Sequence, residues 1–203
     1  MSEWNTLADD AAIQKTAAAL EANGIKVFVA NSGQEAKAKA LELIPQGSEV
    51  MTMSSQTLVA LGLVDEFNES GKYNSIKKKF ATMDPKKDQI EMSRLGAGPA
   101  FAVGSVHAVT EDGHVIIVSA TGSQLPAYAY AAQNAVWIVG AQKLVKTLDD
   151  GFKRINEYVF PLEDARALKA YGGHSGINKM LVINKEVRPG RLTMIIVKEA
   201  LGF

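Results

Sequence analysis

The chain has 203 residues, with 22 Lys and Arg side chains against 22 Asp and Glu side chains, so its formal net charge is zero. This length predicts one large domain over residues 1–203, and the balanced charge gives no support to nucleic-acid binding. The sequence contains no cysteine, which excludes disulfides, thiolate nucleophiles, iron–sulfur ligation and cysteine-based metal sites.

The first residues, MSEWNTLADDAAIQ, show neither the basic start nor the apolar stretch of a secretion signal. No apolar run approaches the roughly 18 residues that a membrane span requires. We therefore expect a cytoplasmic protein without a membrane span. The basic run Lys77–Lys79, with Lys86 and Lys87 nearby, lacks interleaved aromatic residues and is interpreted as a solvated helix face.

The first half of the chain has the pattern of a β-α-β unit. Alanine-rich helical periodicity predicts a helix over 7–22, and IKVFVA at 25–30 predicts a buried strand. A second helix is expected before Pro45, and GSEVMTM at 47–53 predicts the next strand. A hydroxyl-rich turn then leads into a helix over 58–67.

The second half alternates in the same way. Its predicted elements are a polar helical stretch over 73–98, strands at 101–109, 114–120 and 135–140, helices around 152–159 and from Pro161, and strands at 179–186 and 191–199. Helices that alternate with continuous apolar strands predict a three-layer α/β/α fold with a mostly parallel, Rossmann-like sheet. Ligands bind beyond the strand carboxyl ends of such sheets, which points to the turns after Met53, Val109, Ala120 and Gly140.

Three polar turns are candidate ligand contacts. In MTMSSQTL, Ser54, Ser55 and Thr57 could hold a phosphate or carboxylate, although helix capping explains the same residues. In SATGSQ, the segment Thr121–Gln124 could cradle an anion, with Gly122 allowing close approach and Ser123 adding a hydroxyl, although ordinary turn chemistry is the alternative.

The third turn, TEDG, offers Glu111 as a general base or nucleophile, with Asp112 beside it. The alternative is that Asp112-Gly113 forms a tight hairpin. A hairpin would place Glu111 and Thr121 at opposite ends of the sheet, roughly 20 Å apart, and the site would then contain one turn and not both.

Histidine spacing does not predict a metal site, because His107, His114 and His174 lack the helical i, i+4 arrangement. His174 lies in the glycine-rich segment YGGHSG and is a candidate ligand contact. Lys179 follows this segment and would add positive charge to the site. The sequence specifies neither a cofactor nor an oligomeric state.

Four stretches in order resemble the LUD domain family, named for lactate utilisation. They are GSEVMTMSSQTLVALGL, SVHAVTEDGHVIIVSATGSQ, VWIVGAQKLVKTLDDGFKRI and VKEALGF. The resemblance implies a fold like that of ribose-phosphate isomerases, glucosamine-phosphate deaminases and CoA-transferases. It also implies that TEDG is similar to the Ser-Glu-Asn-Gly turn of CoA-transferases, of which Glu111 and Gly113 match.

The family includes the C-type subunit of a bacterial lactate-oxidising system whose other subunits carry iron–sulfur clusters. Many members have a cysteine-rich segment before the last two strands, where this chain has YGGHSGINK. This chain therefore lacks the cysteine ligands that an electron-transfer role linked to an iron–sulfur cluster would need. The sequence supports two hypotheses: an anionic small-molecule binding protein or enzyme of organic acid metabolism, and a non-catalytic accessory or regulatory subunit that contacts oxidoreductase subunits.

Overall fold

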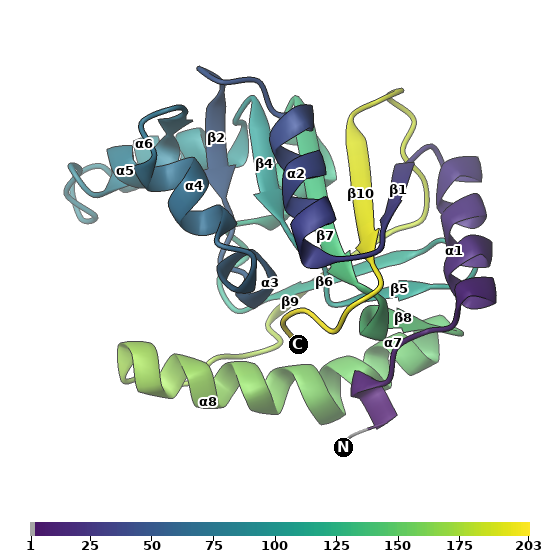
Figure 1. The fold of residues 1–203 in the computed structure, drawn as a ribbon. Helices are drawn as coiled ribbons and strands as arrows, with labels where there is room; N and C mark the ends of the chain where they lie inside the picture. Colours follow the sequence, from purple (N-terminus) through teal and green to yellow (C-terminus); the bar gives the residue numbers. More distant parts are fainter. Residues whose placement is uncertain (1–2) are drawn as a thin grey trace.

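The computed structural model describes residues 3–203. Its centre is a six-stranded sheet in the order β1-β10-β7-β4-β2-β3, in which every neighbouring pair is parallel. The strands are β1 (Lys26–Ala30), β2 (Glu49–Thr52), β3 (Asn74–Ser75), β4 (Phe101–Gly104), β7 (Asn134–Gly140) and β10 (Leu192–Val197). In Figure 1 their carboxyl ends point toward the lower half of the view.

The middle of this sheet is formed by β7 and β10. Their register runs from Leu192 opposite Ala135 to Val197 opposite Gly140, and every residue of β10 is buried. A parallel sheet covered on both faces requires such continuous apolar strands. The prediction of an α/β fold with a mostly parallel central sheet is therefore confirmed.

One face of the sheet is covered by α2 (Gly33–Leu43), α3 (Gln56–Ala60) and α4 (Leu63–Glu69). The single helix expected over 58–67 is divided, because Gly62 adopts the left-handed conformation with φ of 62°. Phe67 of α4 and Leu58 of α3 are both fully buried against the sheet.

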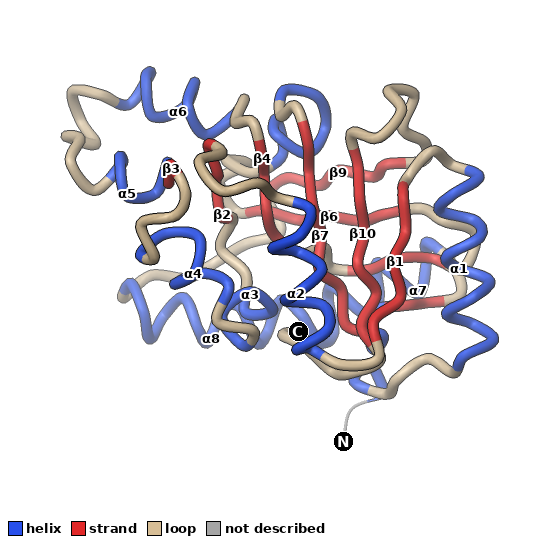
Figure 2. The backbone as a smooth tube through the Cα atoms, turned by 45° about the horizontal axis from the view of Figure 1, so that its top comes forward, coloured by secondary structure: helices blue, strands red, loops and turns tan. Residues whose placement is uncertain are grey.

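The other face is covered by α1 (Asp10–Ala22) and by a second sheet in the order β8-β5-β6-β9. These strands are β5 (Ala108–Thr110), β6 (Val115–Ser119), β8 (Leu144–Val145) and β9 (Lys179–Ile183). Figure 2 shows them running across the direction of the main strands. The strand expected over 101–109 is thus two strands, because the chain leaves the main sheet after β4 and enters the second sheet at β5.

A long helical segment packs on the outside of the second sheet. It consists of α7 (Leu148–Arg154), a π-helical turn η4 (Ile155–Val159) and α8 (Phe160–Tyr171). Pro161 was expected to begin a helix, and it lies in the first turn of α8. The chain nevertheless stays helical from α7 into α8, as Figure 1 shows along the bottom of the view.

The remaining elements are short. The polar stretch expected to be helical over 73–98 forms β3, α5 (Ile76–Phe80) and α6 (Gln89–Ala97). Single helical turns lie at η1 (Glu3–Asn5), η2 (Ala127–Ala131) and η3 (Ala141–Lys143). Among residues 3–203, no helix has both the length and the apolar character that crossing a membrane would need.

Candidate functional site

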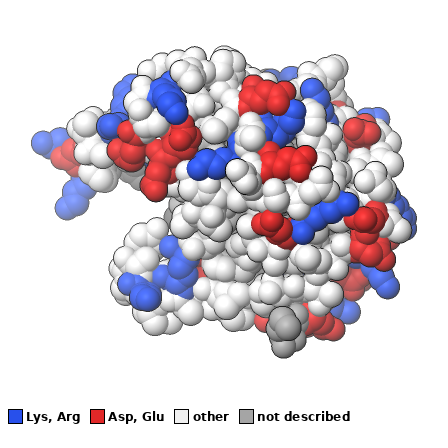
Figure 3. Space-filling model, viewed as in Figure 1, with Lys and Arg blue, Asp and Glu red and all other residues white. Residues whose placement is uncertain are grey.

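A cleft of about 660 Å³ lies at the carboxyl edge of the parallel sheet. Its walls come from the segments 51–56 after β2, 105–107 after β4, 118–124 at the end of β6, and 159–177 along α8. Lys143 and Phe203 also line it, and the remaining lining residues are Val59, Val64, Asn68 and Lys77. Figure 3 shows the molecule hollowed on this side, between the part that carries α8 and the part that carries α4 and α5.

Two of the three predicted turns meet in this cleft. Ser54 and Ser55 line it from the start of α3, and Thr121, Ser123 and Gln124 line it from the end of β6. The hydroxyl of Ser55 also accepts a hydrogen bond from the Leu58 N–H at 3.4 Å, so helix capping and cleft lining coexist in this residue. The turns after β2 and β6 therefore share one site.

The TEDG turn lies elsewhere. Val109 pairs with Val115 in antiparallel register, which makes residues 110–114 a tight hairpin. Glu111 forms an ion pair with Lys15 of α1 at 2.7 Å, and neither Glu111 nor Asp112 lines the cleft. The hairpin alternative applies, and the structure puts Glu111 at the opposite end of β6 from Thr121.

Gly122 and Lys179 support the cleft wall from outside. Lys179 Nζ donates a hydrogen bond to the Thr121 carbonyl oxygen at 2.6 Å. Gly122 has φ of 86°, and a Cβ there would lie 2.6 Å from Cδ of Lys179. Both residues shape the 121–124 turn, although neither lines the cleft itself.

Thr57 is buried below the cleft surface. Its hydroxyl donates to the Leu201 carbonyl oxygen at 3.0 Å and accepts from Nζ of Lys143 at 3.1 Å. Thr57 therefore does not face the cleft as Ser54 and Ser55 do; it holds Lys143, a residue that was not among the predicted site residues.

Lys143 is the main residue that sequence reasoning missed. Only 2% of its surface is exposed, yet it lines the cleft. Besides Thr57, its Nζ donates to Ser105 Oγ at 3.1 Å and to the Val106 carbonyl oxygen at 3.3 Å. All three acceptors are neutral, although a buried ammonium is usually paired with a carboxylate.

A second buried cation lies close to Lys143. Arg154 of α7 is fully buried and donates to the carbonyl oxygens of Gln142, at 3.3 Å, and His107, at 2.5 Å. Among residues 3–203, neither Lys143 nor Arg154 takes part in an ion pair. Lys143 at the cleft floor and Arg154 near it are therefore two buried basic side chains that no carboxylate of the described residues neutralises.

These surroundings change how the floor residues ionise. Burial, with the charge of Arg154, lowers the pKa of Lys143 to about 7. Burial, with the charges of Lys143 and Arg154, lowers the pKa of His107 to about 3. The His107 ring is therefore neutral, and since its Nδ1 accepts from the Val118 N–H at 3.1 Å, its proton lies on Nε2.

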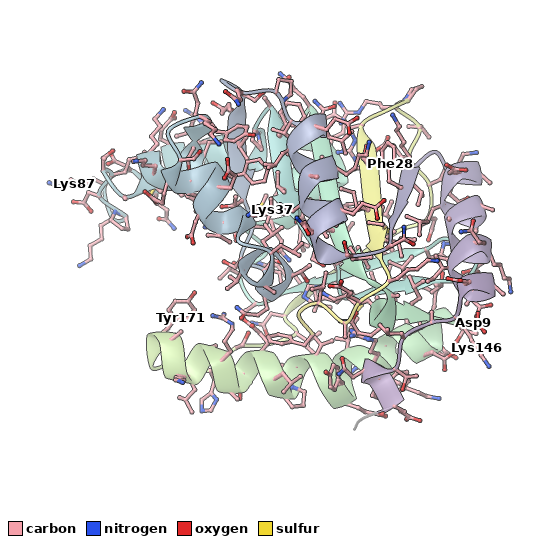
Figure 4. The ribbon with its side chains drawn as sticks, viewed as in Figure 1. Asp9, Phe28, Lys37, Lys87, Lys146 and Tyr171 are labelled. Atoms are coloured by element: carbon pink, nitrogen blue, oxygen red, sulfur yellow. The ribbon has the colours of Figure 1, made fainter. Side chains whose placement is uncertain are left out.

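The opposite wall is formed by α8 and the segment after it. His174, a predicted contact, lines the cleft, and its Nδ1 lies 2.9 Å from Oδ2 of Asp164. The hydrogen bonds from His174 and from the Ser175 N–H lower the pKa of Asp164. Glu163 and Arg166 form a two-bond ion pair on the same wall, with both distances at 2.7 Å. Figure 4 shows Tyr171 at the free end of α8.

A signal for Lys143 was present in the sequence. The residue follows the strand AVWIVG, whose end at Gly140 was already expected at the ligand edge, and an apolar pair comes directly after it. A lysine between two apolar runs must bury its charge or leave the core.

No group of three or more His, Cys, Asp or Glu side chains in the described part of the chain could hold a metal ion.

Known proteins resemble this chain both in sequence family and in structure. Residues 13–197 match the protein family described as the LUD domain. The structure is similar to the crystal structure of a DUF162 family protein from Deinococcus radiodurans, with a TM-score of 0.57 and 11% sequence identity over 95% of this chain and 99% of that chain. At this identity the likeness shows the fold alone. No curated protein matches the sequence.

Proposed function

Because the chain belongs to the LUD domain family, we propose that it binds an anionic small molecule in the cleft and acts in organic acid metabolism such as lactate utilisation. The observation that carries this proposal is the buried amine of Lys143 at the cleft floor, which has no carboxylate partner among residues 3–203 and lies near a second such basic side chain, Arg154. A carboxylate or phosphate from solution would supply the missing negative charge.

The neutral groups of the cleft support the same ligand class. Hydroxyl groups of Ser54, Ser55, Thr121 and Ser123 line it, and each can donate a hydrogen bond to an anionic oxygen. The Nε2–H of neutral His107 is a further donor. The volume of about 660 Å³ lies within the range of about 300–1,000 Å³ that is usual for small-molecule sites.

Glu111 is not part of this proposal. Its carboxylate pairs with Lys15 outside the cleft, so it has no ligand to act on there. The site residues that we propose are Lys143, His107, Ser54, Ser55, Thr121, Ser123, Gln124 and His174, with Thr57, Gly122 and Lys179 in supporting positions.

A thermal-shift screen tests the proposal. A ligand that binds the folded state raises the melting temperature by mass action. The screen uses short hydroxy and oxo acids, sugar phosphates, nucleotides, folates and acyl-CoAs. We expect at least one of these anions to raise the melting temperature of the wild-type protein.

Two lysine variants make the screen specific. Lys143→Met should abolish the ligand-induced rise, whereas Lys146→Met should retain it, because Lys146 is exposed three residues away and does not line the cleft. Figure 4 shows Lys146 near the opposite end of the helical segment from Tyr171. An equal rise in wild-type protein and Lys143→Met would contradict the proposal, and so would a screen in which no anion has an effect.

The accessory-subunit alternative is supported by the surface of α8. Leu162, Leu168 and Tyr171 are 40%, 48% and 73% exposed on this helix. Apolar side chains exposed on one element can form a protein contact. An affinity pulldown from the native cell that recovers oxidoreductase subunits with wild-type protein, and loses them with Leu162→Glu/Leu168→Glu, would favour this alternative.

A further inference from the structure

We infer that Lys143 is a catalytic amine, which forms an imine with the carbonyl carbon of a 2-oxo acid bound in the cleft. This inference rests on the proposed function, because it assumes that the anion binds at the cleft floor. It adds the substrate class and a covalent step.

The contacts of Nζ are compatible with a neutral amine. Such an amine has two N–H donors and one lone pair, so two of its three neighbours accept hydrogen bonds and the third donates to it. The Val106 carbonyl can only accept. The Thr57 hydroxyl has the Leu201 carbonyl oxygen at 3.0 Å and Ser105 Oγ at 3.4 Å as acceptors; it donates to the nearer one, so it accepts from Nζ. In the neutral amine the 3.1 Å hydrogen bond between Nζ and Ser105 would therefore be reversed, with the Ser105 hydroxyl donating to the lone pair.

The hydroxyl of Ser105 can also stop donating to the lone pair of Lys143, because it has another acceptor. Its Oγ lies 3.4 Å from the Val106 carbonyl oxygen, which offers the hydroxyl proton a second acceptor. When Ser105 turns to that oxygen, the lone pair of Lys143 is free to attack a carbonyl carbon. The same hydroxyl can then pass a proton to the carbonyl oxygen, so we assign Ser105 as the proton relay.

The electrostatics of the floor favour this chemistry. A lysine becomes nucleophilic at neutral pH when it is desolvated or lies next to another cation. Lys143 is buried, and Arg154 supplies the neighbouring charge, which together lower the pKa of the amine to about 7. The other titratable and charged side chains on the cleft walls are Lys77, His107, Glu163, Arg166, Tyr171 and His174.

The charge balance indicates why the substrate should carry a carboxylate. Attack by the lone pair forms a C–N bond, and one proton moves from the nitrogen to the carbonyl oxygen through Ser105. A second proton, taken up from solvent, lets the hydroxyl leave as water and gives a protonated imine. No oxidant or reductant is needed for this condensation. The protonated imine restores a positive charge at the buried position of Nζ, and an adjacent carboxylate would neutralise it.

Reductive trapping tests the inference. The protein is incubated with glyoxylate, pyruvate or 2-oxoglutarate and sodium cyanoborohydride, and the modified peptides are identified by mass spectrometry. We expect Lys143 to be modified at least tenfold faster than exposed Lys146 with at least one of the three acids. Trapping should accelerate as the pH rises from about 6 to about 8, because the neutral amine is the nucleophile.

Two further samples separate this inference from the proposed function. Lys143→Arg should retain thermal stabilisation by the acid but give no adduct at position 143. Lactate has a hydroxyl group where a 2-oxo acid has its ketone or aldehyde carbonyl, so it should give no adduct with the wild-type protein. If the oxo acids stabilise the protein through Lys143 but none modifies it faster than Lys146, the imine inference is overturned while anion binding stands. If they neither stabilise nor modify it, both fail for this substrate class.

Discussion

Nζ of Lys143 lies 3.1 Å from Oγ1 of Thr57, whose hydroxyl in turn donates to the carbonyl oxygen of Leu201 at 3.0 Å. This short chain of hydrogen bonds joins α3, the turn after β7 and the segment after β10 below the cleft. The residues that hold the lysine are thus far apart in sequence and are brought together by the parallel sheet.

Removal of the Thr57 hydroxyl should weaken both stability and ligand binding. Thr57→Val keeps the side-chain shape but leaves Lys143 one acceptor short and the Leu201 carbonyl oxygen without this donor. We expect a loss of about 1–3 kcal/mol in the free energy of unfolding, measured by urea denaturation. Thr6→Val, at an exposed threonine, is the matched control and should change little. Equal stabilities of the two variants would argue against the buried hydrogen-bond chain.

Stability should depend on pH through Lys143. Its pKa is lowered to about 7 in the folded state from 10.5, so between these values the unfolded state binds more protons and stability rises with pH. Relative to Lys143→Met, the ligand-free wild-type protein should gain about 1–3 kcal/mol of unfolding free energy between pH about 7 and about 9. Urea denaturation at several pH values measures this gain. Parallel pH profiles of the two proteins would show that the amine titrates in its ordinary range.

Glu111→Gln should leave the cleft unaffected. The substitution weakens only the ion pair with Lys15, whose side chain is 66% exposed. Exposed ion pairs contribute little, so the melting temperature should change by less than about 2 °C. The ligand-induced rise should be the same as in the wild-type protein. If Glu111→Gln has the melting temperature of the wild-type protein but no ligand-induced rise, Glu111 takes part in anion binding and the prediction is wrong.

Gly140→Ala should disturb the packing of the segment after β10 against the end of β7. A Cβ at this position would lie 2.7 Å from both the Glu199 carbonyl oxygen and the Leu201 nitrogen, which are main-chain atoms that cannot rotate away. We expect a loss of about 1–3 kcal/mol in the free energy of unfolding. Gly173→Ala is the control, because nothing lies within 4 Å of its added Cβ. The prediction fails if the two alanine variants have the same urea midpoint.

The sequence predicted the parallel sheet well because its strands are continuous apolar runs such as LTMIIV in β10. It did not separate β4 from β5, since both lie in one apolar stretch and pairing partners distant in the chain decide which sheet each strand joins. The hairpin after Val109 was an open alternative because Asp-Gly favours a hairpin, while the resemblance to the CoA-transferase turn favoured a reactive Glu111.

The candidate site was predicted in part. Ser54, Ser55 and the 121–124 turn follow strands and carry hydroxyls, which is a local signal, and they do line the cleft. Lys143 was missed because the feature that distinguishes it is burial beside Arg154 without an acidic partner, and that depends on the contact between η3 and α7 in the folded chain. Its place after the strand AVWIVG was a signal in the sequence, but only the folded chain shows that this one of 22 Lys and Arg side chains is buried in the cleft without an ion pair among the described residues.

The most direct test of anion binding at Lys143 is an NMR titration of protein labelled with ¹³C in its lysine side chains. The Lys143→Met spectrum identifies the Lys143 signal, and lactate, pyruvate and inorganic phosphate are added in turn. We predict that the Lys143 signal moves and saturates with at least one of these anions while the Lys146 signal does not. Equal, non-saturating shifts of both lysines with all three anions would contradict the proposed site.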